Sequence, residues 1–241
     1  MNLEQADNWP AGTTILVVLA HPDDPEFFMG GTIARWTAAG YTVKYALLTR
    51  GERGISPEFP DSAALASVRV REQKEAAAVL GVHEVTFFDY QDGYLIPSLE
   101  IRREVTRLIR SAKADIVVSC DPQNYFIGEA YLNHPDHRAA GQLVVDAVFP
   151  AVGNPSFFPE LILDGYPATN VSELWLSLPA QANVLLDVSE FWQQRALALL
   201  RHKSQVGDPE KFLAHIEERR LENSGTDDRY VERFRRIIFR K

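Results

Sequence analysis

Short apolar runs alternate with helical patterns along the first 150 residues. The run from Ile15 to Ala20 has no polar alternation, which is typical of a strand buried on both faces of a parallel sheet. A helical pattern from Phe28 to Gly40 and an apolar strand from Tyr41 to Leu48 follow, so the chain opens as a β-α-β unit. Further patterns predict helices over 62–80, 98–112 and 135–148 and strands over 85–88 and 115–119. The sequence therefore predicts an α/β fold whose mostly parallel sheet carries helices on both faces.

The last 90 residues follow a different pattern. Residues 150–167 read as an irregular excursion, and a connection of that length in a compact domain is often the lid or wall of a site. Two short strands over 173–178 and 184–188 suggest an antiparallel pair at the sheet edge. A C-terminal helical segment is expected, with helices over 190–204, 209–222 and 228–239. We expect a single domain over 1–241, with the core in 1–150 and the substrate-wall loop, edge strands and helices in 151–241.

Composition narrows the classes of function. The chain of 241 residues has a net charge of −8, which offers no basic face to a phosphate backbone, so we expect no nucleic-acid partner. Cys120 is the single cysteine and lies in an apolar run, which indicates a buried core thiol and excludes a cysteine-based zinc site. No apolar run is long enough to span a membrane and the first residues do not resemble a signal peptide, so we expect a cytoplasmic protein. The oligomeric state stays open, with a homo-oligomer among the options.

Two clusters of histidine and aspartate stand directly after buried strands. His21, Asp23 and Asp24 follow the first strand, and His134-Pro135-Asp136-His137 opens a helix after the fourth. The carboxyl ends of parallel strands meet at one edge of a sheet, so the two clusters can come together there. His21, Asp24 and His137 would then form a set of two histidines and one carboxylate with an open coordination position.

Asp23 and Asp24 are neighbours in the chain, so they cannot easily turn to the same atom. We expect Asp24 to bind the metal and Asp23 to act as the base for a metal-bound water. Each cluster alone has a plainer interpretation, as a helix cap or a packed histidine, but the occurrence of both at strand ends favours a metal site. The remaining histidines are read as surface residues, His83 in a loop and His202 and His215 on helices, and the basic C-terminal run as a solvated helix end.

Several stretches carry a resemblance to a known family. AHPDDPEFFMGGTIA, LLTRGERG, REQKEAAAVLGV, YQDG and NHPDHRAAG are similar to the motifs of the PIG-L or LmbE-like family of metal-dependent N-acetylglucosaminyl deacetylases, with a weaker echo in RHKSQVGD. The resemblance spans residues 13–150. It implies a Rossmann-like domain without a nucleotide, and a metal, usually zinc, held at His21, Asp24 and His137. It also implies that Asp23 is the general base and that His134, oriented by Asp136, stabilises the oxyanion and protonates the leaving amine.

The expected activity is removal of the N-acetyl group from an N-acetylglucosamine-type sugar or conjugate. The resemblance suggests Arg53, Arg69 and Asp92 as substrate-binding residues, with a solvated surface position as the alternative for each, and leaves Glu26 either as a motif acid or as a support of the helix start. Histidine and carboxylate ligands also accept Fe²⁺, Mn²⁺ or Co²⁺ in place of Zn²⁺. The alternatives are an amidase for a larger N-acyl group, a non-haem iron oxygenase, and a catalytically silent sugar-binding protein.

Overall fold

A computed structural model describes residues 6–54, 61–129, 131–224 and 229–239. Its centre is a sheet of seven strands in the order β3-β2-β1-β4-β7-β9-β8. The first five strands of that order pair in parallel, and β9 runs antiparallel to both of its neighbours. The strands are β1 (Thr14–Leu19), β2 (Thr42–Thr49), β3 (Glu84–Tyr90), β4 (Ile116–Cys120), β7 (Glu173–Ser177), β8 (Val184–Asp187) and β9 (Val231–Ile238). The predicted α/β class and mostly parallel sheet are confirmed.

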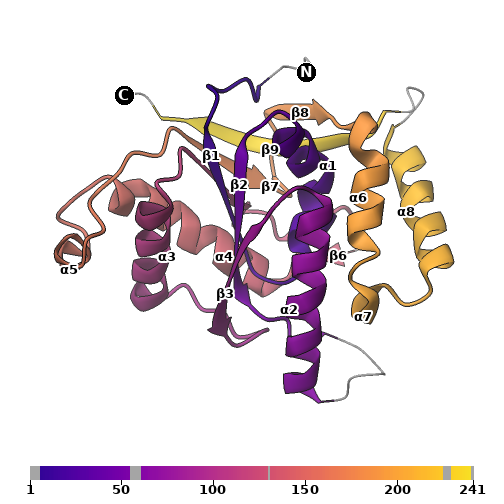
Figure 1. Cartoon of the computed structure of the whole chain (residues 1–241), viewed down its shortest axis with the longest axis horizontal. Helices are drawn as coiled ribbons and strands as arrows, with labels where there is room; N and C mark the ends of the chain where they lie inside the picture. The colour runs from indigo at the N-terminus through magenta and orange to yellow at the C-terminus, as the bar shows by residue number, and fades with distance from the viewer. Residues whose placement is uncertain (1–5, 55–60, 130, 225–228, 240–241) are drawn as a thin grey trace.

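Helices cover both faces of the sheet (Figure 1). One face carries α1 (Asp24–Ala38), α2 (Ser62–Val79) and α6 (Trp192–Leu199), and the other carries α3 (Leu99–Ala112) and α4 (Pro135–Asp146). The other elements are α5 (Pro159–Leu163), α7 (Lys203–Val206), α8 (Pro209–Ser224), a π-helical turn at Ala147–Val152, a 3₁₀ turn at Ser189–Phe191, and a hairpin of β5 (Phe126–Ile127) and β6 (Tyr131–Leu132). In the described part of the chain, no helix is both long and apolar enough to cross a bilayer.

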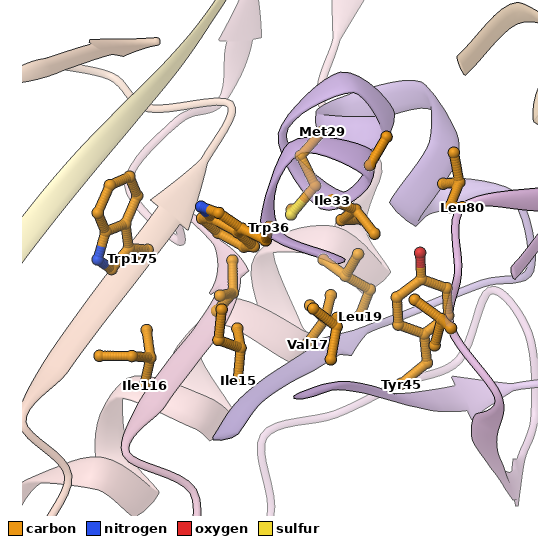
Figure 2. Close-up of a cluster of buried hydrophobic side chains, with 14 of the residues drawn as sticks. Ile15, Val17, Leu19, Met29, Ile33, Trp36, Tyr45, Leu80, Ile116 and Trp175 are labelled. Atoms are coloured by element: carbon orange, nitrogen blue, oxygen red, sulfur yellow. The ribbon is translucent and has the colours of Figure 1, made fainter. Parts of the chain in front are cut away.

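Strand β1 lies at the middle of the five parallel strands and contributes to two hydrophobic cores. Ile15, Val17 and Leu19 pack on one face with residues of α1, as Figure 2 shows, and that cluster also includes residues of α2. Leu16 and Val18 pack on the other face with α3 and α4. Each such side chain stabilises the fold by roughly 1.5–3 kcal/mol on burial. Because both faces are covered, every residue from Ile15 to Leu19 is apolar, which is the pattern that predicted a buried strand.

Helix α1 begins four residues earlier than the sequence pattern predicts. Pro25 occupies its first turn together with the carboxylates of Asp24 and Glu26, positions at which proline and acidic side chains favour a helix start. The glycine pair that suggested the start serves packing instead. A Cβ atom on Gly31 would lie 2.7 Å from Cγ2 of Val188, so only glycine allows α1 to approach the end of β8 this closely.

The prediction of a helix over 228–239 is wrong. Its first residue lies outside the described part, and Val231–Ile238 forms β9, which inserts between β7 and β8. Consequently β7 and β8 do not form the expected antiparallel pair; each instead pairs antiparallel with β9. Glu232 and Phe234 are buried while Arg233 and Arg235 are exposed, an alternation that fits a strand better than a helix.

The other predicted elements agree with the structure except at two places. Ser98 caps α3 by accepting a hydrogen bond from the backbone of Ile101, as predicted. The helix expected over 190–204 is divided into the 3₁₀ turn, α6 and α7, which places His202 in the gap between α6 and α7. The excursion 150–167 contains the short helix α5, and it packs against α3, where Arg110 donates hydrogen bonds to the carbonyls of Ala151, Asn154 and Phe157.

Candidate active site

The loop after β1 is bound to the neighbouring strand and to itself. Both the backbone N–H and the hydroxyl of Thr49 at the end of β2 donate to the carbonyl of Ala20. The backbone N–H of His21 donates to the carboxylate of Asp24, at 2.8 Å. Pro22 removes one backbone torsional freedom between them. The loop therefore presents its side chains at the carboxyl edge of the sheet from a fixed backbone.

Three side chains predicted as metal ligands converge at this edge. Nδ1 of His21 lies 3.2 Å from Nε2 of His137, and Nε2 of His137 lies 3.0 Å from Oδ1 of Asp24. The remaining separation, from Nδ1 of His21 to Oδ2 of Asp24, is 3.6 Å. His137 comes from the first turn of α4, so the structure joins the two sequence clusters as expected.

The outer nitrogen of each imidazole has an acceptor of its own. Nε2 of His21 lies 3.1 Å from Oδ1 of Asp92 and 3.3 Å from Oδ2 of Asp136, and Nδ1 of His137 lies 2.9 Å from the amide oxygen of Asn133. These oxygens accept hydrogen bonds, so in a neutral ring the proton resides on Nε2 of His21 and on Nδ1 of His137. Nδ1 of His21 and Nε2 of His137 then direct their lone pairs at one another and at Asp24. Such an arrangement suits a cation, and the donors match the ligands that zinc prefers.

The carboxylates around His21 and His137 favour a positive charge between these side chains. Burial disfavours the charged form of His21, but the charge of Asp24 and the hydrogen bonds that the imidazole donates to Asp136 and Asp92 outweigh burial and raise the pKa of His21 well above its ordinary value. Burial would raise the pKa of Asp24, yet His137 and His21 hold the pKa of that carboxyl far below its usual range. Geometry permits two further groups of metal donors, His21 with His134 and His137, and His21 with Asp92 and Asp136.

Asp23 lies beside this cluster without joining it. Its carboxylate Oδ2 lies 3.0 Å from Nη2 of Arg69, and its side chain is 16% exposed. Burial raises the pKa of Asp23, and Arg69 opposes that shift. A carboxylate with a raised pKa at the wall of a cavity is suited to accept a proton.

His134 caps α4 and faces the same region. Its Nδ1 accepts a hydrogen bond from the backbone N–H of Asp136, and its ring centroid lies 4.7 Å from that of His21. Burial, followed by the neighbouring histidines His21 and His137, lowers the pKa of His134. Among the described residues, the carboxylate of Asp136 makes no hydrogen bond to His134, although the family resemblance implied that it orients this imidazole. It instead accepts hydrogen bonds from the backbone N–H groups of Gly93 and Leu95 and lies 3.3 Å from Nε2 of His21.

The three residues expected to bind substrate occupy different positions. Arg69 is 4% exposed and donates to the carbonyls of Pro22 and Gly51, so it is not a solvated surface residue. Asp92 is buried and divides its oxygens between His21 and the backbone N–H of Arg53. The guanidinium of Arg53 stacks 4.7 Å from the ring centroid of Tyr94. Of the three, Arg53 is the one whose charged group has no internal ion pair in the described part of the chain.

These residues line one open cavity of about 500 Å³, within the range of small-molecule sites. The lining comprises His21, Asp23, Asp24, Phe27, Phe28, Arg53, Gly54, Arg69, Asp92, Gly93, His134 and His137. The excursion 150–167 contributes none of them, so this cavity does not show it as a lid or wall.

Sequence reasoning missed three residues behind the cavity and misjudged a fourth. Asn133 stands beside the second cluster in NHPDH, and Glu72 and Gln73 lie in the Ala-rich helix, where nothing marks them as buried. The prediction that His202 lies on a helix surface is wrong, because the residue is 0% exposed and contacts Glu26. The exposed positions predicted for His83 and His215 and the buried position of Cys120 are confirmed.

The fold and this edge define a class of protein, a Rossmann-like α/β domain with a candidate metal site and a spare carboxylate where its parallel strands end. The model of the PIG-L family, GlcNAc-PI de-N-acetylase, matches residues 16–148. Diacetylchitobiose deacetylase of Thermococcus kodakarensis is 32% identical over 191 residues, which cover 79% of this chain and 69% of the relative. The chain belongs to the PIG-L family, as its motifs suggested.

Two further comparisons agree with this family. A probable N-acetyl-alpha-D-glucosaminyl L-malate deacetylase 2 of Bacillus anthracis is 29% identical over 199 residues, which cover 79% of this chain and 80% of the relative. The solved structure of N,N'-diacetylchitobiose deacetylase from Pyrococcus horikoshii with its inhibitor MPG matches with a TM-score of 0.81 and 31% identity, and the match covers 94% of this chain and 84% of that one.

Proposed function

We propose that this protein is a metal-dependent hydrolase that removes the N-acetyl group from an N-acetylglucosamine-type amino sugar or conjugate. The observation that carries the proposal is the position of Asp23. Its carboxylate lines the same cavity as His21, Asp24 and His137. Because this carboxylate pairs with Arg69 and not with the candidate metal ligands, it is available to act as a base. The names of the relatives, which are deacetylases of acetylated amino sugars, support this choice of substrate class.

Nδ1 of His21, Nε2 of His137 and the carboxylate of Asp24 would hold the metal, with zinc preferred and Fe²⁺, Mn²⁺ or Co²⁺ as the other options. When bound, such an ion polarises an amide carbonyl and lowers the pKa of a water molecule toward ~7. Asp92, Asp136 and Asn133 hold the two imidazoles in the tautomers that this role requires.

Asp23 accepts a proton from the water that attacks the acetamide carbon. His134 has its Nδ1 occupied by a backbone donor, so its proton resides on Nε2, from which it donates a hydrogen bond to the developing negative oxygen. When the C–N bond breaks, the leaving amine takes a proton, and the products are acetate and a free amino sugar. His134, which lines the same cavity, is the donor that the family resemblance implies for this proton, and the proton taken up by Asp23 is a second source.

Arg53 is the residue we assign to the sugar or its conjugated group, since its guanidinium lies at the cavity with Tyr94 as its stacking partner. Arg69 and Asp92 support Asp23 and His21 instead. Family membership and the separate carboxylate of Asp23 favour hydrolysis over an iron oxygenase or a silent binding protein.

The test combines elemental analysis of anaerobically purified protein with an assay of acetate release from N-acetylated amino sugars, diacetylchitobiose and N-acetylglucosaminyl malate among them. We expect one bound divalent metal per chain and acetate release that stops on chelation. A matched series with longer N-acyl groups separates a deacetylase from an amidase for larger acyl groups. Full metal occupancy without release of any acid from the series would contradict the proposal.

A further inference from the structure

Asp23 has a backbone conformation that residues with a side chain seldom adopt. Its φ is +86° and its ψ is −26°, in the left-handed region. Such a conformation persists only where the surrounding structure holds it. The nearest restraint is Gln73 on α2, whose side-chain oxygen accepts the backbone N–H of Asp23 at 2.7 Å. Gln73 is 0% exposed, so water cannot take its place.

The orientation of the Gln73 amide is fixed by a second buried side chain. Its Nε2 donates to both oxygens of the Glu26 carboxylate, at 3.0 and 3.1 Å. A carboxylate accepts and does not donate, so the amide must place its nitrogen toward Glu26 and its oxygen toward Asp23. Glu26 is itself 0% exposed, and it therefore sets the direction of the bond that restrains Asp23.

Glu26 has a partner from the far end of the chain. Nε2 of His202, in the gap between α6 and α7, lies 3.1 Å from Oε2 of Glu26, and the imidazole is 0% exposed. The other ring nitrogen of His202 is buried without a hydrogen-bond partner in the described structure. A buried polar atom without a partner costs free energy, so we expect His202 to serve a role other than packing.

The segment that carries His202 is anchored to α2. The backbone N–H and the hydroxyl of Ser204 donate to the carboxylate of Glu72, at 2.9 and 2.6 Å. Glu72 is the neighbour of Gln73 on α2. The position of His202 is thus fixed relative to the helix that holds Asp23.

We propose that His202 is a positioning residue for the base, acting through Glu26 and Gln73 on the backbone of Asp23. The proposal rests on the proposed function, in which Asp23 accepts the proton of the attacking water. Without the His202 donor, Glu26 is free to turn, the Gln73 amide loses its imposed orientation, and Asp23 leaves its left-handed conformation. A displacement of ~1 Å in a reacting group can lower a rate by about 100-fold.

The experiment compares His202→Leu, His202→Gln and Lys203→Ala in the metal-loaded enzyme. We expect kcat to fall by about 10- to 100-fold in His202→Leu, with KM and metal content within about 2-fold of the parent. His202→Gln retains an N–H donor for Glu26 and should recover most of kcat. Lys203→Ala changes an exposed side chain on the same segment and leaves the bond from His202 to Glu26 in place, so its kcat should equal that of the parent.

An unchanged kcat in His202→Leu overturns the proposal. So does a loss of kcat that matches a loss of metal, or a His202→Gln variant as slow as His202→Leu. If His202→Leu does not fold, Gln73→Leu tests the same path, and a parental kcat in that variant overturns it. Asp23→Asn separates the two proposals, because a fast Asp23→Asn variant refutes the base assignment itself, whereas a slow one beside a fast His202→Leu variant refutes only the inference.

Discussion

The guanidinium of Arg69 lies 3.0 Å from the carboxylate of Asp23 and also donates to the carbonyl of Pro22, so one buried cation holds both the side chain and the loop of the proposed base. Arg69 opposes the rise that burial causes in the pKa of Asp23. A base that depends on a neighbouring cation should respond in its pH profile when that cation is removed.

Replacement of Arg69 by methionine should therefore shift the acid limb of kcat to higher pH. Without the guanidinium the pKa of Asp23 rises further, and the carboxylate stays protonated and inactive over a wider acid range. The measurement is kcat against pH for the parent and the variant. Arg71→Met on the same helix is the matched control, because Arg71 is exposed. An acid limb that does not move would contradict the coupling between Arg69 and Asp23.

Asp23→Asn should retain metal and lose activity. An amide cannot accept the proton of water, and general base catalysis contributes about 10²- to 10⁴-fold, so kcat should fall by about that factor. His137→Ala serves as the contrasting variant and should lose both metal and activity, because it removes one of three converging donors. Metal content by elemental analysis and acetate release by assay distinguish the two variants. Equal loss of metal in both would remove Asp23 from its role as a base.

Asn133 should matter for metal affinity rather than for chemistry. Its amide oxygen is the partner of Nδ1 of His137, and the loss of such a supporting bond weakens metal binding by about 10- to 100-fold. We expect Asn133→Ala to show that loss in a chelator competition assay, with normal kcat at saturating metal. Asn133→Asp keeps an acceptor at the same place and should bind metal nearly as well as the parent. Equal affinity in Asn133→Ala would contradict this assignment.

Glu173 should make stability dependent on acid pH. Its carboxylate accepts bidentate hydrogen bonds from Arg236 and one hydrogen bond each from the indoles of Trp175 and Trp9. Burial would raise the pKa of Glu173, but these bonds outweigh burial and lower the pKa below the ordinary 4.5. A depressed pKa stabilises the fold above about pH 4.5 and loses that contribution as the pH falls through the folded value.

Glu173→Gln should therefore cost about 1.5–3 kcal/mol at pH 7, the range for hydrogen bonds to a charged group. The difference from the parent should shrink as the pH falls below about 4.5 and through the lowered pKa of Glu173, because the parent carboxylate then becomes protonated as well. Urea unfolding at pH 7 and at a series of acid pH values measures it. Glu84→Gln is the control, because Glu84 pairs with Lys44 on the surface with 60% of its side chain exposed and should cost less than about 1 kcal/mol. A pH-independent difference for Glu173→Gln would argue against this account.

Periodicity alone predicted most of the core. The unbroken apolar run from Ile15 to Leu19 required cover on both faces. The cap at Ser98 and the proline in the first turn at Pro135 mark helix starts that local chemistry controls. The C-terminal strand was misread because Arg235 and Arg236 were taken as a solvated helix end. Arg236 instead lies in β9 and pairs with Glu173 of β7, a partner 63 residues away that no local pattern reveals.

The sequence by itself determined the parallel strands of the sheet, the order of its first helices, and the two clusters that contain His21 and His137, because hydrophobic periodicity and residue type are local properties of the chain. Only the tertiary structure decided which acceptor each imidazole meets, that Asp136 turns to His21, and that His202 lies behind Asp23. The reason is physical. Hydrogen-bond partners inside a protein are set by the packing of elements far apart in sequence, and the cost of burying a polar group is met only once those elements are in place.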